Sequence, residues 1–225
     1  MKHSKFVIPA GLERIVRDIG KANGKSYLVG GAVVDILQAR ELKDWDVEVY
    51  RLSYQQLEEL LSKHGQQNLV GKSFGIIKVK VDGIEYDFSI PRKENRIGVS
   101  HRDFQIQLVP EMTPKEAAQR RDLTINSMFF DLCDYQLHDP YNGIADLKRG
   151  ILRHTSEQFS EDPLRVLRIM QLLPRKGKTV APETLLLCQG MADEYPTIAS
   201  ERVFEEWNKL MLKADKPSIG LRFLV

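Results

Sequence analysis

The stretch "GGAVVDILQARELKDWDVEVY" (residues 30–50) decides the fold, because it joins a glycine turn to a strand with alternating acids. Three acids alternate there with three apolar residues, in the order Asp44, Trp45, Asp46, Val47, Glu48 and Val49. Side chains two apart in a strand point to the same face, so the acids share one face and the apolar residues share the other. Neighbouring carboxylates repel, and this face therefore needs water or cations.

Spacing along the strand selects among the three acids. Same-face neighbours lie roughly 6.6 Å apart, and two catalytic metals lie about 3.5–4 Å apart. Asp44 and Asp46 therefore reach one metal site, whereas Glu48 lies too far along. A third ligand must come from a neighbouring strand, and Asp87 on the polar face of "IEYDFSI" (residues 84–90) is the favoured candidate. Oxygen ligands favour Mg²⁺ or Mn²⁺. A solvated strand face remains the alternative.

The glycine pair Gly30-Gly31 lies between a predicted strand at 26–29 and a predicted helix at 32–39. Strand, glycine turn and helix together bring backbone N–H groups close to a ligand, and the helix N-terminus favours a phosphate. A short glycine motif is equally typical of an ordinary tight turn. Because an Asp-x-Asp strand follows directly, the pair predicts a triphosphate site beside a metal site.

Composition excludes several classes of protein. The chain has 225 residues, 42% of them hydrophobic, which is enough for one large domain or two modest ones. A net charge of +2 does not by itself indicate nucleic-acid binding. The two cysteines, Cys133 and Cys188, form no zinc motif. No apolar run is long enough to span a membrane. We therefore expect a soluble cytoplasmic protein.

The pattern along the chain predicts an α/β domain to about residue 150, followed by a helical segment. Asp82-Gly83 predicts a hairpin between two alternating strands. Residues 91–116 are polar and resist assignment. Pro174 is expected to break a helix early. The final "GLRFLV" carries no stop signal, so we expect the chain to end inside an element.

The opening stretch resembles the signature of class II tRNA nucleotidyltransferases and bacterial poly(A) polymerases, and it is most similar to bacterial CCA-adding enzymes. Further matching motifs follow in the family's order: "VGKSFGIIKV", "DFSIPRKE", "RRDLTIN", "DPYNGIADLKRGILRH", "EDPLRVLR" and, more loosely, "SERVFEEWNKLM". Several long motifs in the correct order are far more specific than a glycine pair.

The resemblance implies an α+β fold. It implies a polymerase-β-like nucleotidyltransferase head over residues 1–150, with a mixed sheet flanked by helices, and an all-helical neck over residues 151–225. Family members continue into body and tail domains, which are absent or truncated in these 225 residues. The chain is then either a fragment containing head and neck or a shortened natural protein.

The resemblance also implies an activity. This activity is Mg²⁺-dependent (or Mn²⁺-dependent) transfer of CMP and AMP from CTP and ATP to the 3′ end of tRNA. Two alternatives keep the chemistry: a bacterial poly(A) polymerase, or an enzyme that adds only CC or only A. A third alternative belongs to another class, a catalytically weak nucleotide- or RNA-binding module.

The resemblance assigns roles to individual residues. Asp44, Asp46 and Asp87 would be catalytic, with the metal on Asp44 and Asp46. Gly30 and Gly31 would hold the triphosphate. The remaining nucleotide-binding residues come from "RRDLTIN" and "EDPLRVLR": Arg121, Asp122, Asn126, Asp162, Arg165 and Arg168.

Physical reasoning supports Asp162 and Arg165 as readers of the base. They are three apart on a predicted helix and therefore share a face. The exocyclic amines of cytosine and adenine donate to Asp, and Arg donates to a ring nitrogen, whereas uracil and guanine present a carbonyl to Asp. A surface ion pair is the default for an isolated Asp-x-x-Arg.

Four basic residues and one departure from the family pattern bear on the binding of RNA and nucleotide. Arg92, Lys93, Arg175 and Lys176 are candidates to contact tRNA phosphates, with solvated surfaces as the alternative. Val34 stands where the family has an arginine. The substitution removes a guanidinium that would contact phosphate or the fold.

Overall fold

The computed structural model describes residues 7–42, 44–96 and 104–225. These residues form two compact units. The sheet unit comprises the described residues up to Ala118 together with Met128–Asp139, and the helical unit comprises Gln119–Ser127 and Pro140–Val225. Chain segments on both sides of residue 127 thus contribute to both units.

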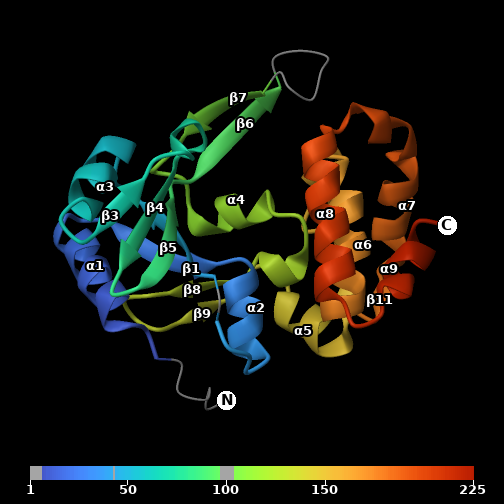
Figure 1. The fold of residues 1–225 in the computed structure, drawn as a ribbon, viewed down its shortest axis with the longest axis horizontal. Helices are drawn as coiled ribbons and strands as arrows, with labels where there is room; N and C mark the ends of the chain where they lie inside the picture. Colours follow the sequence, from blue (N-terminus) through green and yellow to red (C-terminus); the bar gives the residue numbers. More distant parts are fainter. Residues whose placement is uncertain (1–6, 43, 97–103) are drawn as a thin grey trace. The chain divides into compact units, whose positions relative to one another are not determined.

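The sheet unit is built on a seven-stranded sheet in the order β3-β4-β5-β2-β1-β8-β9 (Figure 1). The strands are β1 Lys25–Val29, β2 Asp46–Tyr50, β3 Gln66–Asn68, β4 Ile76–Val81, β5 Ile84–Ser89, β8 Phe129–Asp131 and β9 Leu137–His138. Strands β2 and β5 run parallel, while the other neighbouring pairs are antiparallel. The predicted mixed sheet with flanking helices is confirmed.

Local sequence explains how this sheet is connected. Asp82 and Gly83 both adopt positive φ angles, 51° and 84°, as a two-residue hairpin loop requires. Ser53 caps the helix α3 (Tyr54–Leu61) through a capping box with Gln56. The Asp82-Gly83 hairpin agrees with the sequence prediction. The sheet unit also contains α1 (Ala10–Lys21), α2 (Gly31–Leu37), α4 (Pro114–Gln119, whose last residue is counted with the helical unit) and the 3₁₀ turn η1 (Lys72–Phe74).

The core of the sheet unit lies on the apolar side of the alternating strands. Helices α1 and α3 contact one another, and α1 packs on β1. The fully buried side chains there include Leu28, Val47, Val49, Ile77, Val79, Tyr86 and Phe88. Because the strands alternate, burial of this face forces the charged residues of the same strands onto the opposite face.

Residues 91–116 contain elements that the sequence did not predict. Strands β6 (Arg92–Arg96) and β7 (Phe104–Leu108) form an antiparallel pair, and α4 follows. The strand β6 reads "RKENR", which has no apolar alternation to reveal it. Backbone hydrogen bonds to β7 define this strand, and these depend on a partner rather than on local composition.

The helical unit is dominated by α6 and α8. Its elements are η2 Thr124–Asn126, α5 Gly143–Arg149, β10 Ile151–Leu152, η3 Glu157–Glu161, α6 Leu164–Lys176, β11 Thr179–Val180, α7 Pro182–Gly190, η4 Ala192–Thr197, α8 Ser200–Lys213 and α9 Pro217–Phe223. Buried Leu164, Leu167, Met170 and Leu210 form the apolar cluster between α6 and α8. The predicted helical C-terminal region is confirmed, apart from the short parallel pair β10-β11.

The predicted early break at Pro174 is wrong. Helix α6 includes Pro174 and continues to Lys176. Proline lacks the N–H that would donate to Met170, but only that one bond is lost so close to the helix end. The helix ends instead at Gly177, whose N–H donates to the Leu173 carbonyl oxygen. The functional division predicted at residue 150 remains a prediction.

No helix in the described part of the chain is both long and apolar enough to cross a bilayer.

Candidate active site

Two carboxylates meet on adjacent parallel strands of the sheet unit. The register pairs Asp46, the first residue of β2, with Asp87 of β5. Partners in register point to the same face of a sheet, so both lie on the face opposite the core. Asp46 is exposed and the Asp87 side chain keeps 33% of its surface. The structure therefore brings Asp87 beside the acidic strand, as expected; its catalytic role stays a prediction.

Asp44 lies outside the strand that the sequence predicted for it. Strand β2 begins at Asp46, although the Trp45 carbonyl oxygen still accepts the Asp87 N–H at 2.9 Å. Trp45 is buried, with its ring 6.1 Å from the ring of Tyr86. This anchor holds the segment against the sheet and leaves Asp44 exposed. The spacing calculated along a regular strand therefore applies to Asp46 and Glu48 and not to Asp44.

Glu48 has a partner within the sheet unit. The Tyr50 hydroxyl donates to Glu48 Oε2 at 2.5 Å. The Glu48 carboxylate is thus hydrogen-bonded to a residue of its own strand, which agrees with leaving Glu48 out of the predicted metal site.

Lys78 is a site residue that the sequence analysis missed. Its Nζ donates to both carboxylate oxygens of Asp87, at 3.0 and 2.9 Å, and β4 pairs with β5 so that Lys78 faces Asp87. The hydrogen bond to Asp87 raises the pKa of Lys78, so the side chain stays a cation. The signal was present in the sequence. A two-residue loop at 82–83 sets Val81 opposite Ile84, and counting back from it places Lys78 opposite Asp87.

The glycine pair has the geometry that a close backbone approach requires. Gly30 has φ 69° and ψ −138°, a conformation open only to glycine, and it precedes the first residue of α2. A Cβ added to Gly31 would meet no atom of the described structure within 4 Å. The turn therefore leaves open space at Gly31. Val34, three residues later, is 1% exposed and packs in the core.

Two groups of residues in the sheet unit have the donor atoms that a metal ion requires. Asp44, Asp46 and Asp87 offer only carboxylate oxygens, which suit Mg²⁺ or Mn²⁺. Among the described residues, the group of three such side chains whose ligand atoms all lie within 4.8 Å of one another is instead Asp131, Asp134 and His138. Asp131 Oδ1 already accepts the backbone N–H groups of Cys133 and Asp134, so this second group stabilises a turn.

In the helical unit, "RRDLTIN" and "EDPLRVLR" meet in one buried network. Asp122 is 6% exposed; its Oδ1 accepts from Asn126 at 3.0 Å and its Oδ2 from Arg168 Nε at 2.7 Å. Burial alone raises the pKa of Asp122, but the charge of Arg168 and the hydrogen bonds outweigh it and hold that pKa below its ordinary value. The Asp122 charge in turn raises the pKa of Arg168.

The network extends to α8 through a residue that the sequence analysis did not name. Glu206 is 2% exposed and accepts from Lys209 at 2.6 Å, with Arg168 Nη1 3.9 Å away. The Arg121 guanidinium makes a long contact of 3.5 Å with the Asn126 carbonyl oxygen. Four of the predicted nucleotide-binding residues thus come together, and their hydrogen bonds to one another give them a positioning role in this structure.

Asp162 and Arg165 differ from the expectation that they share a helix face. Helix α6 starts at Leu164, so Asp162 lies before it and caps it: Asp162 Oδ1 accepts the Leu164 N–H at 3.1 Å. Asp162 Oδ2 accepts from Arg202 of α8 at 2.7 Å. Arg165 donates to the carbonyl oxygens of Gln158 and Arg120 at 2.6 and 2.9 Å. Backbone carbonyl groups therefore orient the Arg165 guanidinium.

The candidate RNA-binding residues lie in two places. Arg92 donates to the Phe74 carbonyl oxygen at 2.9 Å, while Lys93 beside it on β6 is exposed. Arg175 contacts the Gln171 side chain near the end of α6, and Lys176 is the last residue of that helix. The two pairs belong to different units, and their contact with tRNA stays a prediction.

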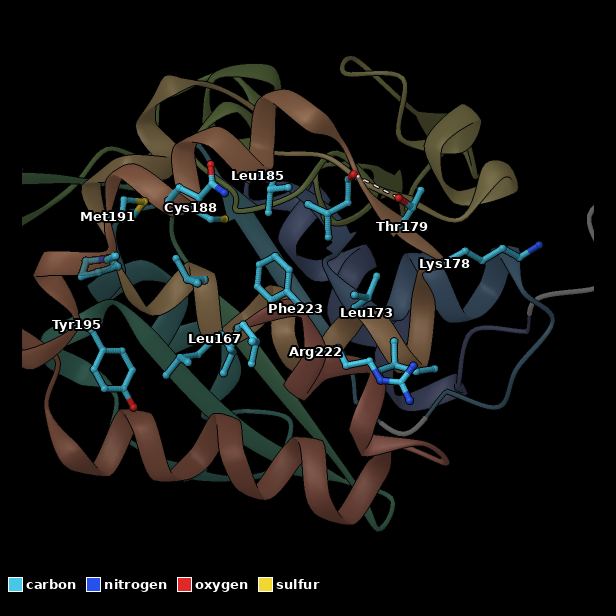
Figure 2. A pocket seen from close by; sticks show the side chains of 18 residues that line it. Leu167, Leu173, Lys178, Thr179, Leu185, Cys188, Met191, Tyr195, Arg222 and Phe223 are labelled. Carbon is cyan, nitrogen blue, oxygen red and sulfur yellow. Dashed lines mark hydrogen bonds between the residues drawn. The ribbon is translucent and has the colours of Figure 1, made fainter.

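A cavity of about 820 Å³ lies inside the helical unit (Figure 2). Its lining comes mainly from α6, α7, η4 and α9, with further residues from β11 and the end of the chain, and it contains no Asp or Glu among the described residues. Leu167, Leu173, Met191 and Phe223 point toward one another across it, while the Lys178 ammonium extends away. The lining is largely apolar, and its charged side chains, Lys178 and Arg222, are cations that do not bind a metal ion.

Comparison with known proteins identifies relatives for both units. Residues 26–153 match the family model of the poly A polymerase head domain, and residues 178–225 match the model described as probable RNA and SrmB-binding site of polymerase A. The Multifunctional CCA protein of Chromobacterium violaceum is 39% identical over 85% of this chain and 46% of its own length. That of Vibrio parahaemolyticus is 39% identical over 88% and 48%.

Solved structures agree in fold. A Bacillus stearothermophilus CCA-adding enzyme in complex with CTP superimposes with a TM-score of 0.81 at 24% identity, over 97% of this chain and 52% of that one. An apo form of a CCA-adding enzyme gives the same TM-score at 25% identity, over 96% and 52%. The chain thus spans about half the length of the curated relatives and structures that it matches.

Proposed function

Because the chain belongs to the poly A polymerase head-domain family, we propose that it adds CMP, CMP and AMP to tRNA 3′ ends, with CTP and ATP as substrates and Mg²⁺ or Mn²⁺ as cofactor. The observation that carries this proposal is the register of Asp46 with Asp87 on adjacent parallel strands, beside the open glycine turn. We also propose that the protein acts in the cytoplasm, on these substrates.

In this proposal Asp44 and Asp46 bind the divalent cations and Asp87 completes the acidic face. Bound cations would lower the pKa of the attacking 3′-hydroxyl and neutralise charge on the leaving pyrophosphate. Gly30 and Gly31 offer backbone N–H groups to the triphosphate without a side chain in the way. The protein then contributes positioning and electrostatics, with no covalent intermediate.

The helical unit would choose the base. Asp162 accepts from the exocyclic amine of cytosine or adenine, and Arg165 donates to a ring nitrogen. The capping bond to Leu164 and the two carbonyl contacts of Arg165 hold these groups in place before a nucleotide arrives. The buried bond between Asp122 and Arg168 supports the same helix. Arg92, Lys93, Arg175 and Lys176 are proposed to contact tRNA phosphates, on the basis of their charge alone.

The test is nucleotide incorporation by the 225-residue chain. Purified protein is given tRNA lacking its 3′ CCA, with CTP and ATP separately and together, and in parallel with UTP or GTP. We expect CC with CTP alone, CCA with both, and little incorporation of U or G. The double variant Asp44→Ala, Asp46→Ala should lose activity below detection while keeping its circular dichroism spectrum. Glu48→Gln, which changes an acid on the same strand face, should remain active.

Other outcomes identify other functions. Long A tails on unrelated RNA would indicate a poly(A) polymerase. Addition of only CC or only A, whichever nucleotides are present, would indicate a partial CCA-adding activity. Absence of incorporation by the parent chain with every metal and RNA tried would support a nucleotide- or RNA-binding module instead.

A further inference from the structure

We propose that Lys78 is a positioning residue of the carboxylate site, which holds both oxygens of Asp87 and sets the charge that a divalent cation meets there. This inference rests on the proposed metal-dependent function of that site. The register of three neighbouring strands brings Lys78 to this site.

The contacts of Lys78 favour Asp87 over its other neighbour. Its Nζ lies 3.0 and 2.9 Å from the two oxygens of Asp87, but 3.4 Å from the nearest oxygen of Glu85. Asp87 is also less exposed than Glu85, at 33% against 60% of the side-chain surface. The shorter and less hydrated pair is the stronger one. The ammonium is therefore bound to the candidate third carboxylate on both of its oxygens.

The position of Lys78 is set by the fold. Ile77 and Val79 on either side of it are 0% exposed, so a shift of β4 by one residue would bury Lys78 and expose the core. The hairpin turn fixes the same register. The row Asp46, Asp87 and Lys78 thus runs across β2, β5 and β4 in register. This arrangement distinguishes Lys78 from a mobile surface lysine.

The consequence is a change in charge at the site. Asp44, Asp46 and Asp87 together carry three negative charges, and Lys78 compensates one of them, which leaves −2. A cation at the site is repelled by the ammonium and competes with it for Asp87. A divalent ion roughly 6 Å from an ammonium in a water-like medium should gain about tenfold in affinity when that ammonium is removed. Asp87 would at the same time lose its fixed orientation.

The experiment measures Mn²⁺ binding directly, by electron paramagnetic resonance of the free ion, in the parent chain and three variants. Lys78→Met should bind Mn²⁺ about tenfold more tightly yet incorporate nucleotide more slowly at saturating metal. Lys78→Arg keeps the cation and should retain the parental affinity. Lys80→Met is the matched control, because Lys80 lies two residues along the same strand face and opposite Glu85.

Two results would overturn the proposal. Unchanged Mn²⁺ affinity in Lys78→Met would show that Lys78 only neutralises a surface acid. An equal gain in Lys80→Met would show a general effect of net charge. If the parent chain incorporates no nucleotide, the proposed function fails, but the Mn²⁺ titration still decides the role of Lys78.

Discussion

At the scale of single residues, the glycine pair combines a backbone requirement with an open space. Gly30 needs its positive φ and no other residue replaces it without strain. Gly31 has no such need, because its φ is ordinary for a helix and a Cβ would touch nothing within 4 Å among the described atoms. A ligand bound close to the backbone would give glycine a role at position 31.

This difference makes Gly31→Ala a direct test of the triphosphate site. The free energy of unfolding of the variant should stay the same or rise by up to about 1 kcal/mol, because alanine favours a helix. Its KM for CTP should rise at least about tenfold, because the methyl group fills the space proposed for phosphate. Gly20→Ala, also with nothing within 4 Å, is the control and should leave KM unchanged. An unchanged KM in Gly31→Ala would move the triphosphate elsewhere.

Val34, which stands where the family has an arginine, is buried in this structure. Its side chain is 1% exposed in α2, among the buried residues Ala32 and Val33. A valine here contributes apolar packing to the fold. Residue 34 is buried in this structure and does not face the solvent.

At the scale of elements, the contact between α6 and α9 depends on a glycine. A Cβ added to Gly220 would lie 2.3 Å from the Met170 carbonyl oxygen and 2.8 Å from Leu210 Cδ1. The Met170 carbonyl is also the group to which Pro174 cannot donate. The same carbonyl thus marks both the lost helical bond and the closest approach of α9.

Gly220→Ala should therefore destabilise the helical unit, by about 1–3 kcal/mol, because the backbone must shift to admit the methyl group. In an unconstrained helix the same change would stabilise by about 0.5–1 kcal/mol. Urea unfolding, followed by circular dichroism, measures the difference. Gly190→Ala, in α7 with no atom within 4 Å, serves as the control and should be neutral or stabilising. A stabilised Gly220→Ala variant would contradict the close packing.

At the scale of the whole molecule, one ion pair between a buried aspartate and a half-buried arginine joins segments far apart in the chain. Asp122 and Arg168 are 46 residues apart and connect the segment around η2 to α6. This contact is one of those that hold residues 119–127 in the helical unit, even though strand β8 returns to the sheet unit directly afterwards.

The pair also predicts a dependence of stability on pH. The pKa of Asp122 is lowered by folding, so its stabilisation is complete above the ordinary value of 3.8 and is lost as pH falls through the lower folded value. Asp122→Asn should cost about 2–3 kcal/mol near neutral pH, because Arg168 loses a charged hydrogen bond. The difference from the parent should shrink below about pH 4.

Urea unfolding of the parent and Asp122→Asn between about pH 7 and about pH 2 measures this difference. Asp193→Asn, at an exposed position of the helical unit, is the control and should change the free energy of unfolding by less than about 0.5 kcal/mol. A constant difference over the whole pH range would show that the ionised form of Asp122 contributes nothing specific.

Local pattern was enough to predict the elements with strong periodicity or turn chemistry. The alternating strands and the Asp82-Gly83 hairpin follow from forces within a few residues, and both agree with the structure. Strand β6 and the continuation of α6 through Pro174 were not predicted. Strand β6 is defined by its pairing with β7, which its own composition does not reveal. Pro174 is tolerated because it lies near the end of α6.

The sequence by itself determined which residue types face away from the core and, through its motifs, the family. Alternation along β2 and β5 already separated acids from apolar residues. Only the tertiary structure decided which side chains from separate segments meet, such as Asp46 with Asp87 and Asp162 with Arg202. The physical reason is that periodicity is a property of one segment, whereas a hydrogen bond between segments depends on register and packing that no single segment contains.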